Sequence, residues 1–402
     1  MMKLSDYVDV NPKTQLPKGA QVPFVGMDAI TVGRRKVTAN ERREAKGSGA
    51  KFLPGDTLFA RITPCLENGK IAQFSDKEAG LGSTEFFVLR AKPNVSDQDF
   101  VFYFALQEEL RAAAEKSMTG ASGRQRADVS ALKEFGCEFP SLPTQRRIAG
   151  ILSTYDELIE NNQRRIRILE DMTRSLYREW FVHFRYPGHE SVPLTDSHLG
   201  PIPQGWEVKS APDCIAFNPR TTVSRDGEKP FVPMGCLSND SMLISDIESR
   251  SGNSGAKFQN GDTLFARITP CLENGKTGFV QFLFNSQDVA FGSTEFIVLR
   301  SRTLSPEFVY CLARSDEFRN AAIKSMSGAT GRQRVQEKCF DAFVIAQPPR
   351  ELLDRFTKIV ASSFRLIHSI HHQTANLRRT RDLLLPRLLS GQVGLAVAEE
   401  TI

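Results

Sequence analysis

The chain has 402 residues, of which 40% are hydrophobic and 25% are charged, and this composition excludes long disordered tracts. Because single hydrophobic cores stop growing beyond roughly 250 to 300 residues, we expect two domains. The 52 Lys and Arg side chains exceed the 47 Asp and Glu by only five charges, so the net charge neither requires nor excludes a polyanionic partner.

The sequence carries no signature of a metal site or of a membrane segment. The seven cysteines are scattered, and no Cys/Cys or Cys/His pair has zinc-finger spacing, so we expect no structural metal. The first residues lack an apolar signal core, and no apolar run approaches the roughly 20 residues that a membrane-spanning helix needs. We therefore expect a cytoplasmic protein with no membrane partner.

The first elements in the chain are strands and turns, followed by a helix. Residues Thr57–Ile62 alternate as a strand does, and Phe86–Leu89 is a short apolar run bounded by polar residues. Ala, Leu, Glu and Arg at helical spacing predict a helix over Phe100–Lys116. This part of the chain is predicted to be an α/β domain.

A long helix is predicted next, because suitable residues recur in alternating steps of four and three, as in a coiled coil. These seam residues are Ile148, Leu152, Tyr155, Ile159, Asn162, Ile166, Leu169, Thr173, Leu176 and Trp180. No Gly or Pro interrupts Ile151–Tyr186, which allows a helix of about 35 to 40 residues, or roughly 50 to 60 Å.

The whole pattern then occurs a second time. Gly55–Lys70 reads GDTLFARITPCLENGK, and all sixteen residues recur at Gly261–Lys276. Two further blocks recur with few changes: GSTEF at Gly82–Phe86 and Gly292–Phe296, and KSMTGASGRQR at Lys116–Arg126, which becomes KSMSGATGRQR at Lys324–Arg334. The offset is 206 in the first block, 210 in the second and 208 in the third, so length changes fall in loops. We expect two related domains, each with its own connecting helix.

The second copy predicts the same elements, with strand-like segments at 263–268 and 296–299, a helix over 308–324 and a second long helix over Glu351–Leu385. Its seam residues are Phe356, Val360, Ser363, Ile367, Ile370, Thr374, Leu377, Arg381, Leu384 and Leu388. We expect the two long helices to pair as an antiparallel coiled coil, with the polar residues Asn162, Thr374 and Arg381 fixing the register. The alternative is that each helix is an ordinary core helix of its own domain.

The predicted organisation is a first recognition domain over residues 1–142, a spacer helix over 143–186, a second recognition domain over 187–348, and a spacer helix with a tail over 349–402. This order resembles the specificity subunit of a type I restriction-modification enzyme. PSLPTQRRIAGILSTYDELIENN at Pro140–Asn162 is similar to the entry into that family's first spacer helix, and LLLPRLLSGQ at Leu383–Gln392 to the end of its second. The GDTLFARITPCLENGK and GSTEF blocks are similar to segments of its target recognition domains.

The resemblance implies that each recognition domain reads one half of a split sequence in double-stranded DNA, while the paired helices set the gap. It also implies docking of two methyltransferase subunits and, in complexes that cleave DNA, of two restriction or translocase subunits. S-adenosylmethionine, ATP and magnesium would then be bound by those partners. This chain would bind no cofactor and catalyse no reaction.

The sequence itself offers little that is catalytic. It has neither a P-loop nor an NPPY methyltransferase motif, and Asn11–Lys13 and Asn218–Arg220 share only the first two letters of the latter, which fits turns. One alternative is a metal-dependent nuclease that uses Asp56, Glu67 and Lys70, with twins in the second copy. The spacing of Glu67 and Lys70, with a glycine between them, disfavours this alternative.

Two repeated segments are the candidates for DNA contact. The glycine-rich turns end in Arg-Gln-Arg, and Arg can pair with guanine, Gln with adenine, or both arginines can hold phosphates. The LENGK turns and the arginines before them could reach phosphate or a base edge, or could instead hold the fold together. The candidates are Arg61, Asn68, Lys70, Arg124, Gln125 and Arg126 in the first copy, and Arg267, Asn274, Lys276, Arg332, Gln333 and Arg334 in the second.

The similarity of the two copies predicts two similar half-sites, close to an inverted repeat if the domains face each other. Residues 28–50 differ greatly from 235–256, however, and contact of these segments with bases would make the half-sites diverge. A rival function is a scaffold whose domains bind protein rather than DNA.

Overall fold

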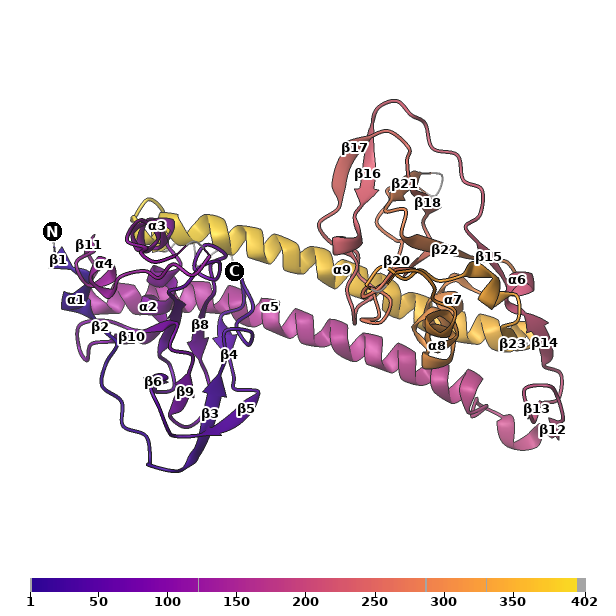
Figure 1. Cartoon of the computed structure of the whole chain (residues 1–402), viewed down its shortest axis with the longest axis horizontal. Coiled ribbons are helices and arrows are strands. Elements are labelled where there is room, and N and C mark those ends of the chain that lie inside the picture. Colours follow the sequence, from indigo (N-terminus) through magenta and orange to yellow (C-terminus); the bar gives the residue numbers. More distant parts are fainter. Residues whose placement is uncertain (1, 122, 286–287, 330, 396–402) are drawn as a thin grey trace. The chain divides into compact units, whose positions relative to one another are not determined.

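The computed structural model describes residues 2–121, 123–285, 288–329 and 331–395, which form two compact units (Figure 1). The first unit contains the described residues up to Asn161 together with those from Thr374 on, and the second contains Asn162–Gln373. Each unit combines a mixed α/β head with parts of both long helices. We call residues 2–141 the first head and residues 183–349 the second head.

The first head is built on two mixed sheets. The five-stranded sheet has, in spatial order, β2 (Val8–Val10), β10 (Phe86–Ala91), β7 (Thr57–Ala60), β8 (Ile71–Phe74) and β4 (Lys36–Val37). The four-stranded sheet has β5 (Glu41–Glu44), β3 (Gln21–Val25), β9 (Gly80–Gly82) and β6 (Ala50–Phe52), and β1 (Met2–Lys3) pairs separately with β11 (Gly136–Cys137). The predicted strand over 57–62 is therefore present but ends at Ala60, and the apolar run at 86–89 lies within β10.

The sequence predicted one continuous helix over Phe100–Lys116, but the structure has two helices there, so this prediction was wrong. The helices of this head are α1 (Leu4–Tyr7), α2 (Gln98–Ala105), α3 (Glu108–Lys116) and α4 (Val129–Lys133). The backbone of Gln107 is extended, with a ψ of 139°, and it separates α2 from α3. The side chain of Asp97 begins α2 by accepting hydrogen bonds from the amides of Asp99 and Phe100.

The second head repeats this plan. One four-stranded sheet has β15 (Ile215–Phe217), β22 (Phe296–Ser301), β19 (Thr263–Ala266) and β20 (Thr277–Phe279), and the other has β17 (Glu248–Ser251), β16 (Glu228–Val232), β21 (Val289–Gly292) and β18 (Ala256–Gln259). Two smaller pairs join β12 (Leu194–Thr195) to β13 (Ile202–Pro203) and β14 (Glu207–Ser210) to β23 (Val344–Gln347). The helices are α6 (Ala211–Cys214), α7 (Pro306–Arg314) and α8 (Asp316–Lys324). Ser315 divides the helix predicted over 308–324, because its extended backbone ends α7 and its hydroxyl caps α8.

The two copies share their strand register. Thr57 of β7 lies opposite Leu89 of β10, and Thr263 of β19 lies opposite Leu299 of β22. The turn before each of these strands is held by a buried aspartate, Asp56 or Asp262, whose carboxylate accepts hydrogen bonds from a single arginine of the neighbouring strand. The duplicated sequence thus gives duplicated hydrogen bonding.

Two long helices, α5 (Leu142–Tyr177) and α9 (Arg350–Leu389), are each divided between the units. The helix predicted over Ile151–Tyr186 begins earlier and ends earlier than expected. It begins earlier because Pro143 lies in the first turn, where a proline costs no hydrogen bond. It gives way to a π-helical turn at Arg178–Val182. Pro386 lies inside α9 near its end.

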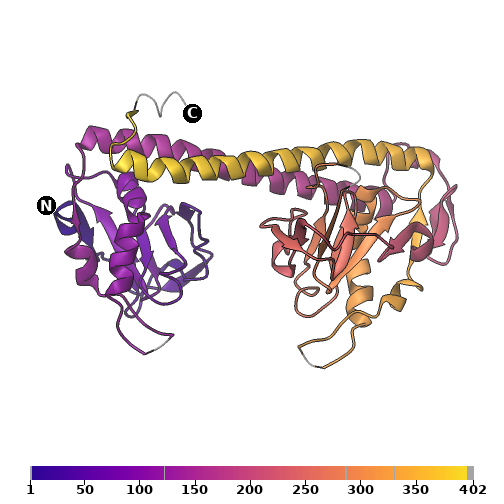
Figure 2. The same cartoon turned by 90° about the horizontal axis from the view of Figure 1, so that it is seen from above.

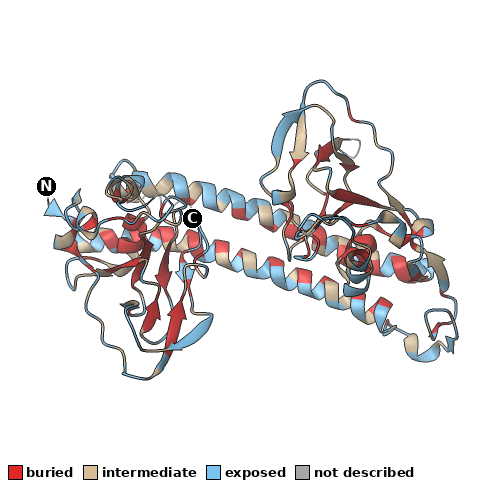
Figure 3. Cartoon of the chain, viewed as in Figure 1, coloured by how far each residue is buried: buried red, intermediate tan, exposed pale blue. Residues whose placement is uncertain are grey.

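The predicted seam residues lie on the buried side of both long helices, which is visible as a red stripe in Figure 3. Eight of the residues proposed for pairing are buried, namely Ile148, Leu152, Ile159, Asn162, Ile166, Val360, Ile367 and Ile370. The other three, Leu169, Leu377 and Leu384, are partly buried against the cores of their units. In the first unit the last part of α9 shares a core with the first part of α5, and in the second unit the opposite parts of the two helices share one.

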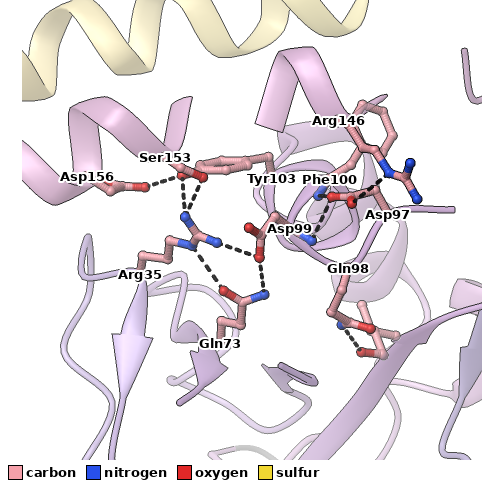
Figure 4. A network of polar contacts seen from close by, with 11 residues as sticks. Arg35, Gln73, Asp97, Gln98, Asp99, Phe100, Tyr103, Arg146, Ser153 and Asp156 are labelled. Carbon is pink, nitrogen blue, oxygen red and sulfur yellow. Dashed lines mark hydrogen bonds and ion pairs between the residues drawn. The ribbon is translucent and has the colours of Figure 1, made fainter. Parts of the chain in front are cut away.

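A polar network joins the first head to α5 (Figure 4). The guanidinium of Arg35 donates hydrogen bonds to Gln73, to Tyr103 and to Ser153 of α5, and it forms an ion pair with Asp99. Tyr103 in turn donates to Asp156 of α5 at 2.6 Å. Because Arg35 is almost entirely buried, these contacts replace the water that its charge loses on folding.

Within the described ranges, none of the helices combines the length and the apolar character that a bilayer crossing requires.

Candidate nucleic-acid interface

The Arg-Gln-Arg segments lie in loops that project from each head on the side away from that head's portion of the long helices, as Figure 2 shows for the loops after α3 and α8. In the first head the loop closes through backbone hydrogen bonds between Thr119 and Arg126 in both directions, at 3.0 and 2.9 Å. Gly120 and Gly123 have φ values of 122° and 80°, which residues with a side chain rarely adopt. Ser122 and its counterpart Thr330 lie outside the described residues.

The loop is anchored on the repeated ITP segment. Thr63 donates its amide to the carbonyl of Gln125 at 3.0 Å, and its hydroxyl accepts the amide of Gln125 at 3.1 Å. In the second head the same two bonds join Thr269 and Gln333, at 3.1 and 3.0 Å. The structure thus brings together two blocks that are some sixty residues apart in each copy.

The second arginine of each loop is held by a glutamate of the GSTEF block. Arg126 donates through Nε and Nη2 to both carboxylate oxygens of Glu85, at 2.7 to 3.0 Å, and Arg334 makes the same fork with Glu295. The hydrogen bonds from Arg334 lower the pKa of Glu295, so its carboxylate stays charged at neutral pH. Sequence reasoning missed the role of these glutamates, although the repetition of GSTEF was a signal.

The first arginine of each loop is different. Arg124 and Arg332 are exposed, and within the described ranges no hydrogen bond or ion pair holds either side chain. Gln125 and Gln333 are half-buried, and their backbones serve as the loop anchors. Each Arg-Gln-Arg loop therefore presents one arginine, Arg124 or Arg332, whose side chain has no partner among the described residues, beside one arginine that is paired with a glutamate.

The arginines that precede the anchors belong mainly to the fold. Arg61 lies over the ring of Phe87 at 5.0 Å, and its buried Nε has no hydrogen-bond partner among the described residues. Arg267 donates to Glu337 at 2.9 Å and also has a buried Nε without a partner in that part of the chain. Both arginines are half-buried, whereas Arg124 is exposed.

The lysines of the LENGK turns were open to two interpretations, and the structure favours the structural one. The amine of Lys70 donates to the carbonyl of Met27 at 2.8 Å, and that of Lys276 donates to the carbonyl of Met234 at 3.0 Å. Lys70 thereby fixes the chain just after β3, and Lys276 fixes the chain just after β16. Asn68 and Asn274, two residues before, are exposed.

The nuclease alternative finds no support in the placement of its residues. The side chain of Asp56 is almost fully buried, and its carboxylate accepts hydrogen bonds from Arg90 and from the amide of Leu53. Glu67 is exposed, and the amine of Lys70 is bound to Met27. Across the described ranges, no three His, Cys, Asp or Glu side chains lie close enough together to hold a metal ion.

A stacked arginine on each edge hairpin was also missed by sequence reasoning. The guanidinium of Arg43 on β5 lies 3.6 Å from the ring centre of Phe24 on β3, and that of Arg250 lies 4.0 Å from the ring centre of Phe231. Both arginines also pair with the glutamate two residues before, Glu41 or Glu248, at 2.6 Å. An E-x-R pattern at the offset of 207 was the available signal.

The duplicated heads can be compared with known protein families. Residues 4–171 match the family described as the Type I restriction modification DNA specificity domain. The MjaIX specificity subunit of Methanocaldococcus jannaschii is 26% identical over 304 residues, which cover 72% of this chain and 68% of that protein. The HindI specificity subunit of Haemophilus influenzae is 21% identical over 438 residues, which cover 91% of this chain and 94% of that protein.

The fold has a counterpart among solved structures. The type I restriction-modification S subunit from M. genitalium superposes with a TM-score of 0.55, at 15% identity and over 96% of this chain and 95% of that one, so the two share a fold. The resemblance noted in the sequence is confirmed. Residues 4–171 carry this specificity domain, and the chain is similar over most of its length to type I restriction-modification specificity subunits.

Proposed function

We propose that this chain is the DNA-reading subunit of a type I restriction-modification complex, and that each head reads one half of a bipartite target in double-stranded DNA. The observation that carries the proposal is the exposed, unpaired arginine of each projecting loop, Arg124 or Arg332, held on the same anchors in both heads. Because the anchors and the neighbouring Arg–Glu fork are the same in both copies, the two half-sites should be similar in length and contact geometry.

Arg124 and Arg332 serve as phosphate contacts in this proposal. A cation without a protein partner gives up no ion pair when it moves onto a phosphate, whereas Arg126 and Arg334 would have to leave their glutamates. Gln125 and Gln333 follow immediately and reach a base edge, where Gln recognises adenine through paired hydrogen bonds. The exposed amides of Asn68 and Asn274 add polar contacts beside the same anchor.

The long helices act as the spacer, paired as an antiparallel coiled coil. The burial of the four-three seam supports this arrangement, as does the sharing of each unit's core by opposite parts of the two helices. A rigid spacer fixes the number of unread base pairs between the half-sites. The polar residues Asn162, Thr374 and Arg381, all buried, would set the register.

The exposed side of the helices docks two methyltransferase subunits. Leu158 of α5 and Leu366 of α9 occupy equivalent positions of the repeat and are 40% and 41% exposed, which is unusual for leucines on otherwise polar helix faces. Two equivalent apolar positions fit two copies of one partner. Those partners would bind S-adenosylmethionine, and in complexes that cleave DNA two translocase subunits would bind ATP and magnesium, while this chain would act in the cytoplasm without catalysing a reaction.

The test is a methylation map of DNA modified by the chain together with its methyltransferase subunit. We expect one bipartite motif with a gap of fixed length, and tight, salt-sensitive binding of duplexes that carry it. Methylation without any bipartite motif would contradict the proposal. A chain that binds its protein partner but shifts no duplex in a mobility assay would instead be a scaffold.

A further inference from the structure

Each head has an open hollow at the same place in its fold, lined in part by the GST residues that precede Glu85 or Glu295. The hollow of the first head measures about 480 Å³ and that of the second about 750 Å³. Equivalent residues line both: Phe24, Met27, Arg43 and the loop 82–84 in the first head, and Phe231, Met234, Arg250 and the loop 292–294 in the second. The repetition shows that the hollow is a built feature of the domain.

The floor of the hollow is held by contacts common to both copies. Lys70 and Lys276 fix the carbonyls of Met27 and Met234 from behind. The chain also passes so close to the GST loop that a Cβ at Gly49 would meet the carbonyl oxygen of Gly82 at 2.5 Å. At Gly255 the corresponding distance, to Gly292, would be 1.9 Å. The chain at Gly49 and at Gly255 therefore lies close to the GST loop in both heads, and no residue other than glycine fits at either position.

The rim of the hollow differs between the copies, although the surrounding blocks barely change. Asp28, Glu44 and Lys46 line the first hollow. At the equivalent offset of 207 the second copy has Gly235, Ser251 and Asn253, and the latter two line the second hollow together with Arg225. The first rim is thus rich in carboxylates, while the second combines an arginine with hydroxyl and amide groups and has no carboxylate among its lining residues.

The rim groups keep hydrogen-bonding capacity for a ligand. Glu44 pairs with Lys46 at 2.5 Å, but a carboxylate has about four acceptor sites and this contact uses only part of them. Asn253 donates one hydrogen to the carbonyl of Val223 at 3.2 Å, which leaves its oxygen and its second hydrogen. Arg225 is exposed. Arg43 and Arg250, in contrast, are stacked and paired in both heads, so they cannot distinguish one half-site from the other.

We propose that these two hollows are further base-reading sites of the heads, in addition to Gln125 and Gln333, and that their rims make the two half-sites differ. The inference rests on the proposed function and assigns the discrimination to named residues. Carboxylates accept hydrogen bonds from the exocyclic amino groups of cytosine or adenine, whereas Arg recognises guanine and Asn recognises adenine in the major groove. The half-site read by the first head contains cytosine or adenine at the base that faces Glu44. The half-site read by the second head contains a purine at the base that faces Arg225 and Asn253.

The test exchanges the rims in the full chain, in complex with its methyltransferase subunit. Glu44→Ser with Lys46→Asn gives two positions of the first rim the residues of the second, and Ser251→Glu with Asn253→Lys does the reverse. Asp28 and Arg225 are unchanged in both variants. The readout is the methylated motif, together with the sequences that each complex selects from a pool of random duplexes. Glu109→Ser with Lys133→Asn is the matched control, because it makes the same chemical changes at exposed positions of α3 and α4.

We expect each rim variant to change one half-site by about tenfold or more in preference at one or two bases, and to leave the other half-site and the gap as they were. Loss of preference confined to that one half-site supports the inference equally. The control variant should select the wild-type motif. Two rim variants that both select the wild-type motif would overturn the inference while leaving the proposed function intact. A wild-type complex with no bipartite motif would overturn the proposed function itself.

Discussion

Asp156 of α5 and Arg381 of α9 form an ion pair in which the two side chains are only 5% and 10% exposed. The second oxygen of the same carboxylate accepts the hydroxyl of Tyr103 from the first head. Burial, together with the charge of Asp156, raises the pKa of Tyr103, so the phenol stays protonated and continues to donate. One carboxylate therefore ties the head and both long helices together in the first unit.

In the second unit, aromatic rings form the equivalent contact between the head and its long helix. Phe364 stands at the position of Asp156, and Phe279 at that of Gln73. The rings of Phe279 and Phe364 lie 4.9 Å apart, and Tyr310 lies 5.5 Å from Phe364. The position of Arg381 is taken by Thr173. The junction between head and long helix is therefore polar in the first unit and aromatic in the second.

Removing one partner of the buried pair should be costly. Asp156→Ala leaves the guanidinium of Arg381 without its main partner, and we expect the free energy of unfolding to fall by about 3 to 5 kcal/mol. Denaturant unfolding of the full chain measures this change. Asp171→Ala removes an exposed ion pair with Arg174 and should cost under about 1 kcal/mol.

The double variant Asp156→Leu with Arg381→Met separates charge loss from packing loss. Because an apolar pair of similar volume often replaces a buried ion pair without loss, we expect it to be more stable than Asp156→Ala. A double variant no more stable than Asp156→Ala would show that the geometry of the pair, rather than an uncompensated charge, holds this junction.

The stability of the second unit should depend on pH through Glu170. Burial raises the pKa of this carboxyl above its ordinary 4.5, against the opposing effect of hydrogen bonds from Met242 and Ser241. Between the unfolded-state and the folded-state pKa the carboxyl ionises in the unfolded chain but stays protonated in the folded one, so stability is lost as pH rises through this interval. Glu170→Gln cannot ionise, so its Tm should exceed that of the wild type at pH 8, and the gain should shrink towards pH 5. The exposed Glu157→Gln is the control, and an equal gain at both pH values would rule out the titration of Glu170 as the cause.

The projecting arginines should govern the salt dependence of DNA binding. Each phosphate contact that is lost reduces the slope of log affinity against log salt by about one. Arg124→Ala with Arg332→Ala should therefore lower the slope by about two and weaken binding to all duplexes alike. Arg302→Ala removes an exposed arginine of the second head outside the loop, and an equal loss of slope per charge in this variant would indicate a general charge effect rather than defined contacts.

Prediction from sequence succeeded where the pattern is local or repeated, and failed where it depends on tertiary pairing. The long helices α5 and α9, the burial of one side of each, and the strands at Thr57 and Phe86 follow from periodicity. Arg381 appeared only as a polar interruption of the seam, because its partner Asp156 lies 225 residues away and off the seam. The break at Gln107 has neither Gly nor Pro to mark it.

The candidate DNA-contact residues were likewise predicted only where the sequence pattern is repeated, and not where their role depends on tertiary contacts. The turn arginines could be found because their block is repeated, but which of the two is free depends on Glu85, 41 residues before Arg126 in the chain. Lys70 has the positive charge expected of a phosphate contact. Only the fold shows that its amine already donates a hydrogen bond to the carbonyl of Met27. The stacking of Arg43 on Phe24 requires the register of β3 with β5, which composition does not give.

Shortening the spacer should shorten the gap in the target. Deleting seven residues from the middle of α5 and the matching seven from α9 removes two full turns from each helix, so every seam residue keeps its side. At 1.5 Å per residue the helices lose about 10 Å, which corresponds to about three base pairs of B-form DNA. Methylation mapping should therefore find the same half-sites separated by a gap about three base pairs shorter. A deletion in α5 alone places the seams out of register, and it should lower the Tm and abolish the motif. An unchanged gap after the matched deletion would mean that the helices do not set the distance, because the heads would then reach the DNA independently of the length of α5 and α9.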